Sequence, residues 1–108
     1  MIFVKNLKTY FGEGYYIGRK SFGYYSSIFR NRFLLSKDLS RSESLEMYEK
    51  WFLEEYCKKG DLFDEFERLV FVAKKEDLFL LCWCDPLPCH GNILKKYLEA
   101  RISGKEIL

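Results

Sequence analysis

The feature that most constrains the fold is an uninterrupted apolar run over residues 78–84, LFLLCWC. The run shows no alternation of apolar and polar residues, and turn-forming residues flank it on both sides. This pattern is typical of a strand that is covered on both faces, as in the centre of a parallel or mixed sheet. It is also far shorter than the ~20 residues that a membrane-spanning helix needs. We therefore expect a central strand, and no membrane partner.

Helical patterns surround this central strand. The sequence SRSE at residues 40–43 has the spacing of a capping box, which predicts that a helix begins near residue 41. Gly60 is suited to end that helix, and Asp61 is suited to cap the next one, which should end near Ala73. Apolar residues at helical spacing predict a closing helix over 93–102.

Shorter segments complete the predicted architecture. IFVKNL at 2–7 and YYIGR at 15–19 are expected to be strands, and 20–33 is expected to be an ordered, aromatic-rich loop. Residues 103–108 are either a tail or a last edge strand. Strands separated by helices indicate an α/β fold. We predict a single small α/β domain over 1–108, with a mixed or parallel sheet of about four strands and three helices.

Charge is distributed unevenly along the chain, although the net charge is only +2. Residues 1–41 contain eight Lys/Arg and two Asp/Glu, whereas the remainder contains ten and fourteen. A basic amino-terminal segment favours a small anionic ligand on one face, but not the strongly basic surface of a dedicated nucleic-acid binder. Lys5 and Lys8 interrupt the amino terminus, so we expect no signal peptide, a cytoplasmic location and reduced thiols.

The strongest candidate for a functional site is CWCDPLPCHG at residues 82–91. It contains three of the four cysteines, the only histidine and both prolines. It follows the predicted central strand and precedes a helix, which is where ligands bind in α/β folds. Pro86 and Pro88 should hold the connection extended, and Gly91 should let the backbone approach a ligand closely. Free N–H groups at the helix start would favour an anion.

The residue types leave three interpretations of this stretch open. The first is a zinc site, since zinc binds sets of three cysteines and one histidine. The spacing C-x-C-x₄-C-H lacks the usual C-x₂-C or H-x₃-H ligand pairs. The ligands would be Cys82, Cys84, Cys89 and His90. Alternatively, Cys89 at a helix start beside His90 would have a lowered pKa and act as a nucleophilic or redox thiol. In the third interpretation Cys82 and Cys84 are core residues, and His90 either caps the helix or bonds a backbone carbonyl.

An arginine provides the second candidate. Arg19 follows Gly18 at the end of a predicted strand, and its guanidinium group is suited to bidentate binding of phosphate or carboxylate. Asn31, between Arg30 and Arg32, adds donors in the neighbouring loop.

Four motifs together resemble a known family: YIGR, the S-x-x-x-N-x-F pattern from Ser27 to Phe33, the Y-x-x-W pattern of Tyr48 and Trp51, and the late CWC-x-P-x-x-CHG. The family consists of small proteins of unknown function in bacteria and their phages, and the resemblance covers roughly residues 15–98. The family has Asn-Pro-Phe where this chain has Asn31-Arg32-Phe33.

The resemblance implies a compact α/β domain and a viral setting, but no activity. By analogy it gathers a set of residues around one pocket. These residues are Gly18, Arg19, Asn31, Cys84, Cys89, His90 and Gly91.

Our leading hypothesis is a binding protein for a nucleotide or a similar phosphorylated or ribosyl compound. Arg19 and the N–H groups of His90 and Gly91 would bind the anion, and Asn31 would bind polar edges. Trp83, or the pair Tyr24 and Tyr25, would stack on a ring.

In a viral setting, such a protein would sequester a nucleotide defence signal in the host cytoplasm. One alternative is an enzyme that cleaves a nucleotide or glycosidic bond with His90 or Cys89, with Asp85 as the nearest acid. Another is a zinc-stabilised interaction module that touches nucleic acid. The many aromatic residues also suit a homo-oligomer interface.

Overall fold

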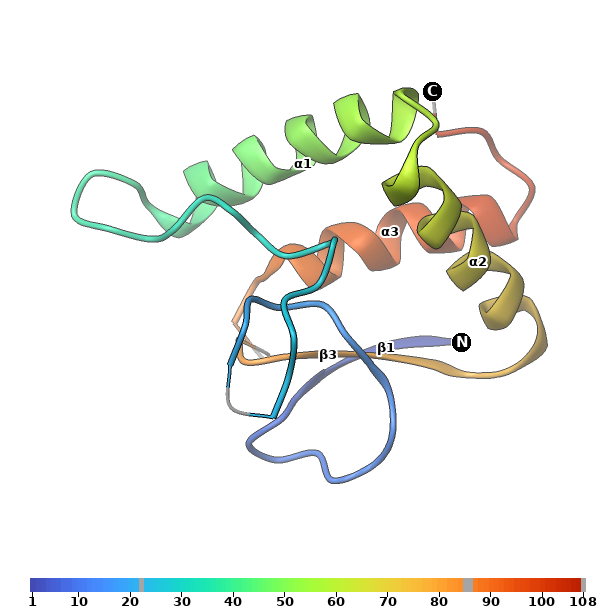
Figure 1. Cartoon of the computed structure of the whole chain (residues 1–108), viewed down its shortest axis with the longest axis horizontal. Helices are drawn as coiled ribbons and strands as arrows, with labels where there is room; N and C mark the ends of the chain where they lie inside the picture. The colour runs from blue at the N-terminus through green and yellow to red at the C-terminus, as the bar shows by residue number, and fades with distance from the viewer. Residues whose placement is uncertain (22, 85–86, 108) are drawn as a thin grey trace.

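The sheet of the protein has three parallel strands, with the predicted central strand in the middle. In the computed structural model, β1 (Ile2–Asn6) and β2 (Tyr15–Tyr16) flank β3 (Leu78–Cys82) on either side (Figure 1). The structure describes residues 1–21, 23–84 and 87–107. All of β3 except Phe79 is buried. The prediction of a buried central strand is confirmed.

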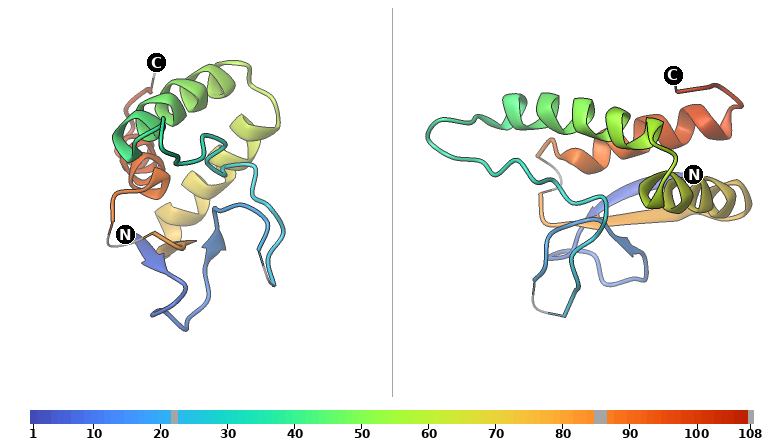
Figure 2. Two further views of the ribbon diagram at one scale, coloured as in Figure 1. Left: turned by 90° about the vertical axis from the view of Figure 1, so that its left-hand side faces the viewer. Right: turned by 45° about the horizontal axis from the view of Figure 1, so that its top comes forward.

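All three helices lie on one side of the sheet (Figures 1 and 2). α2 (Asp61–Lys75) and α3 (His90–Ile102) pack on the strands, while α1 (Arg41–Cys57) packs on these two helices and lies farther from the sheet. The other side is covered partly by rings, because Phe3 and Tyr10 both stack on Phe79 with centroid distances of 5.0 and 5.3 Å. The predicted α/β class with three helices is confirmed.

Local sequence explains where the helices begin. Ser40 caps α1 through the predicted capping box, since Glu43 N–H donates to its hydroxyl and the Glu43 carboxylate accepts from Ser40 N–H. α2 begins one residue earlier than predicted, with Gly60 as its N-cap and Asp61 in its first turn, where a carboxylate is favoured by the helix dipole. α3 also begins early, at His90, because Cys89 caps it.

The predicted strand over 15–19 is shorter than expected. After Tyr16 the chain bends around the ring of this residue, whose hydroxyl donates to the carbonyl of Arg19. A Cβ at Gly18 would lie 2.5 Å from that hydroxyl oxygen, so only glycine fits inside the bend. Within the described residues the sheet has three strands, not about four, since residues 103–107 form no strand.

The aromatic residues mainly build the core. Tyr48 and Phe52 of α1, Phe66 of α2 and Phe29 of the preceding loop are almost completely buried. The hydroxyl of Tyr48 also lies inside the core, where it donates to the carbonyl of Phe29 over 2.7 Å. The loop that carries the candidate residues is therefore anchored to α1. None of the helices in the described part of the chain is long and apolar enough to cross a membrane.

Candidate functional site

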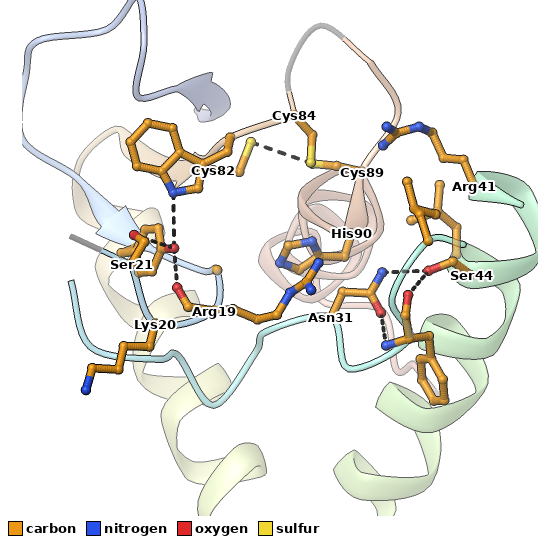
Figure 3. A pocket seen from close by; sticks show the side chains of 16 residues that line it. Arg19, Lys20, Ser21, Asn31, Arg41, Ser44, Cys82, Cys84, Cys89 and His90 are labelled. Carbon is orange, nitrogen blue, oxygen red and sulfur yellow. Dashed lines mark hydrogen bonds between the residues drawn. The ribbon is translucent and has the colours of Figure 1, made fainter. Parts of the chain in front are cut away.

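A cavity of about 380 Å³ lies where the carboxyl ends of β2 and β3 meet the amino-terminal ends of α1 and α3 (Figure 3). This is the edge of a parallel sheet at which α/β folds bind ligands. The cavity brings together parts of the chain that are far apart in sequence. They are Tyr16–Ser21, the loop at Asn31–Leu35, the first turn of α1, Cys82–Cys84 at the end of β3, and Cys89–His90 at the start of α3.

Most of the predicted site residues line this cavity. Those that do are Gly18, Arg19, Asn31, Trp83, Cys84, Cys89 and His90. The arginine after β2 and the cysteine- and histidine-bearing connection therefore face a common hollow. Asp85 and Pro86 lie outside the described residues. That the lining residues bind a ligand stays a prediction.

Gly91 is the exception, because it lies outside the cavity and packs against the sheet. A Cβ at Gly91 would lie 2.9 Å from Cδ1 of Ile17 and 3.0 Å from Cγ1 of Val4. Its N–H donates to Sγ of Cys89 over 3.3 Å, so it does not point to a ligand. The close approach predicted for this glycine is therefore an approach of α3 to β1 and to Ile17.

The charged side chains around the cavity are cationic. Arg19, Lys20 and Arg41 line it, and no described lining residue is acidic. Arg19 and Lys20 are exposed, and neither side chain makes a hydrogen bond or ion pair with another described residue. Arg41 donates from Nη1 to the carbonyl of Pro88 over 2.9 Å and also hydrogen-bonds Cys84, so part of its guanidinium group is already engaged. The cavity therefore stays electropositive even when Cys84 is a thiolate, because three cations line it beside this one thiol of lowered pKa.

Sequence reasoning missed Arg41. It lies in the first turn of α1, where the helix dipole favours acidic over basic residues. A basic residue directly after a strong N-cap runs against that preference. This local conflict was the signal that could have identified it.

His90 is buried and held by the backbone. Its Nε2 lies 2.7 Å from the carbonyl oxygen of Ile17, and its ring meets Tyr48 edge-on at 5.1 Å. Burial lowers the pKa of His90, and the nearby charge of Arg19 lowers it further. The ring is therefore neutral, with the proton on Nε2 donated to Ile17. Nδ1 is then the acceptor of the ring.

Asn31 has a positioning role in the loop. Its Oδ1 accepts from Phe33 N–H and its Nδ2 donates to Oγ of Ser44, both over 2.9 Å. Ser44 in turn donates to the carbonyl of Phe33 over 2.5 Å. The amide thus ties the loop to α1, and one N–H of Nδ2 is left to point elsewhere.

The neighbouring arginines are used in packing. Arg32 replaces the proline that the resemblance predicts, and its guanidinium lies 4.1 Å from the ring centroid of Trp51. This cation–π contact fixes the turn without a proline ring. Arg30 donates to the carbonyl of Ser27 over 3.0 Å. Neither of them lines the cavity.

The aromatic candidates separate into two groups. Trp83 is 42% exposed and lines the cavity, and its indole N–H donates to the hydroxyl of Tyr16 over 3.2 Å. Tyr24 is already stacked on Tyr16, with ring centroids 4.5 Å apart, and Tyr25 is 91% exposed away from the lining. Of these three candidates, Trp83 is therefore the one that lines the cavity.

Three thiols form one wall of the cavity. Sγ of Cys89 lies 3.7 Å from Sγ of Cys82, and no disulfide forms among the cysteines of the described residues. Hydrogen bonds to Cys82 and Cys84, together with burial, raise the pKa of Cys89. The prediction of a lowered pKa at Cys89 is therefore wrong, because the neighbouring sulfurs and burial outweigh the helix start.

Cys84 is the thiol with thiolate character. A hydrogen bond from Cys89 lowers the pKa of the Cys84 thiol to about 6, and a hydrogen bond and positive charge from Arg41 contribute in the same direction. Cys84 is also the most accessible of the three sulfurs. The lowered thiol pKa therefore falls at Cys84 and not at Cys89, while the reactivity of either thiol stays a prediction.

The zinc alternative stays a prediction. Within 1–21, 23–84 and 87–107, no group of three or more His, Cys, Asp or Glu side chains is arranged to hold a metal ion. His90 also commits Nε2 to a backbone carbonyl, so only Nδ1 could serve as a ligand.

Comparison with known proteins places the chain in one family. Residues 4–100 match the model of a domain of unknown function (DUF4326), and the chain belongs to this family. The match includes every residue that lines the cavity. No curated protein and no solved structure gives a significant match.

Proposed function

We propose that the cavity binds a small anionic ligand, namely a nucleotide or a compound derived from one. The observation that carries this proposal is the unpaired guanidinium of Arg19, which shares a cavity with Lys20 and Arg41 and with no described acid. Three cations around one cavity, against a single thiolate at Cys84, favour the binding of a further anion.

The two helix starts reinforce this charge. The amino-terminal ends of α1 and α3 both reach the cavity, and each carries a partial positive charge. Arg19 and Arg41 enter from the segments after β2 and at the start of α1 (Figure 3). A phosphate between them would accept bidentate, charge-assisted hydrogen bonds from both.

The remaining lining suits a ring and its sugar. Trp83 offers an indole face, and Phe33 and Leu35 supply apolar surface. Nδ1 of the neutral His90 is an acceptor that suits a ligand hydroxyl or N–H group. A cavity of about 380 Å³ is near the lower end of the roughly 300–1,000 Å³ of small-molecule sites, so a mononucleotide fits better than a larger compound.

This proposal includes a biological setting. The resemblance to bacterial and phage proteins suggests that the chain sequesters a nucleotide signal, in the cytoplasm of the host if it is viral. Binding without turnover suits this use. A homo-oligomer is compatible with it, since Phe11, Tyr25 and Phe71 are exposed.

A thermal-shift panel tests the proposal. The probes are the nucleoside 5′-monophosphates, with the matching uncharged nucleosides and inorganic phosphate as controls. A mononucleotide at 100 times its Kd should stabilise the fold by about 2.7 kcal/mol, and its nucleoside should stabilise it less. No shift with any mononucleotide would contradict the proposal. Chromatography of the same samples would reveal turnover, which the enzyme alternative requires.

Variants then locate the site. Arg19→Gln should weaken mononucleotide binding about 10- to 100-fold, because a hydrogen bond to a charged group contributes about 1.5–3 kcal/mol. Lys74→Gln is the matched control, since Lys74 is an exposed cation at the far end of α2. Equal losses in both variants would show that the anion binds through net charge alone, against a specific site.

A further inference from the structure

The three thiols on the cavity wall form a cluster whose members differ in how far they are buried. Cys82 ends β3 and Cys89 caps α3, and both are buried, with 1% and 2% of their surface exposed. Cys84 is only partly buried and lines the cavity beside them. A small reagent that enters the cavity therefore meets Cys84 first. The fourth cysteine, Cys57, is exposed at the opposite end of α1.

Cys89 lies between the other two sulfurs. It is 3.7 Å from Sγ of Cys82, and it is in hydrogen-bonding contact with Cys84. The backbone N–H of Cys89 is hydrogen-bonded in this position, because it donates to Oδ1 of Asn92 over 3.0 Å. A thiol that touches an accessible cysteine in this way is placed to react with it once that cysteine is oxidised.

We propose that Cys84 is an oxidation site for hydroperoxides and that Cys89 is its resolving thiol. In the first step the Cys84 thiolate attacks one peroxide oxygen, so that an S–O bond forms and the O–O bond breaks. The sulfur is oxidised to a sulfenic acid, and the peroxide is reduced to water or an alcohol after protonation of the leaving oxygen. In the second step Sγ of Cys89 attacks Sγ of Cys84. An S–S bond forms, the S–O bond breaks, and the hydroxide leaves as water with the proton of Cys89.

The surroundings of Cys84 support the first step. Its thiolate is stabilised by Cys89 and by the guanidinium group of Arg41, which also counters the charge on the departing oxygen. Oxidation of a cytosolic protein by this route is transient and reversible, in line with the reduced state expected of its thiols. The proposal does not require that the cavity bind a nucleotide, so either one can fail alone.

Peptide mapping by mass spectrometry tests this site on the full chain. The reduced protein is treated with hydrogen peroxide, with and without dimedone, which traps sulfenic acids. We expect a disulfide between Cys84 and Cys89 in the native sequence, and dimedone on Cys84 in Cys89→Ser. Serine also caps helices, so this variant should keep its fold. Cys84→Ser should give neither product, and Cys57→Ser should behave as the native sequence does.

The mapped products also decide against the proposal. Dimedone on Cys57 but not on Cys84 would overturn it. A Cys82–Cys89 disulfide formed as fast in Cys84→Ser would also overturn it. So would stoichiometric zinc that the cysteines retain in the purified protein.

Discussion

Replacing Gly91 by alanine tests the tight contact between α3 and the sheet. The new Cβ would lie 2.9 Å from Ile17 Cδ1 and 3.0 Å from Val4 Cγ1, well inside the optimal carbon–carbon separation of about 3.5–4.0 Å. Ile17 is fully buried, so its side chain cannot move into solvent. Overpacking of this kind costs about 1–3 kcal/mol.

An opposing effect must be subtracted. In an open helix, alanine is more favourable than glycine by up to about 1 kcal/mol. Because Gly91 is in the first turn of α3, we expect about half of that gain. The net loss in unfolding free energy is then about 0.5–2.5 kcal/mol. For a domain of 108 residues this lowers Tm by about 2–11 °C.

Thermal and urea unfolding of Gly91→Ala measure this loss. Glu99→Ala is the control, because it introduces the same side chain at an exposed position of the same helix. Mononucleotide affinity of the folded variant should change little, since Gly91 does not line the cavity. A Tm that is unchanged or raised in Gly91→Ala would refute the packing argument.

Two further predictions concern stability. Tyr48→Phe should lower the unfolding free energy by about 1–3 kcal/mol, because it leaves the carbonyl of Phe29 without its buried hydrogen-bond partner. The control Tyr25→Phe, at the surface, should leave the unfolding free energy unchanged, and similar losses in the two variants would contradict this. Unfolding free energy should fall as pH decreases. From about pH 8.5 to 6 the fall comes from Cys84, whose folded pKa is lowered, so Cys84→Ser should flatten this range. Below about pH 6.5 the fall in unfolding free energy comes from His90, which stays neutral in the folded protein while the unfolded chain gains a proton. His90→Gln should therefore flatten the pH dependence in that range. If neither variant alters the slope of unfolding free energy against pH, both assignments are wrong.

The elements could be predicted because their signals are local. The run LFLLCWC predicted the central strand, which ends two residues earlier at Cys82, and the pair Ser40 and Glu43 predicted the start of α1. The end of β2 could not be predicted in this way. It depends on the ring of Tyr16 folding back against Gly18, and nothing in YYIGR distinguishes that bend from a continued strand.

For the site, sequence reasoning identified the residues better than their roles. Arg19 and His90 were predicted from their positions after a strand and before a helix, and the structure brings them to one cavity. The state of the thiols depends on which sulfurs touch, which spacing alone does not determine. Cys89 therefore has a raised pKa and Cys84 a lowered one, contrary to the expectation from the helix start alone.

An NMR titration of the ¹⁵N-labelled protein with a nucleoside 5′-monophosphate tests the central claim most directly. We expect saturable shifts of backbone amides in Gly18–Lys20, in the first turn of α1 and in residues 89–90, with the same shifts weakened about 10- to 100-fold in Arg19→Gln. Shifts confined to other surfaces, or none at saturating mononucleotide, would contradict the account.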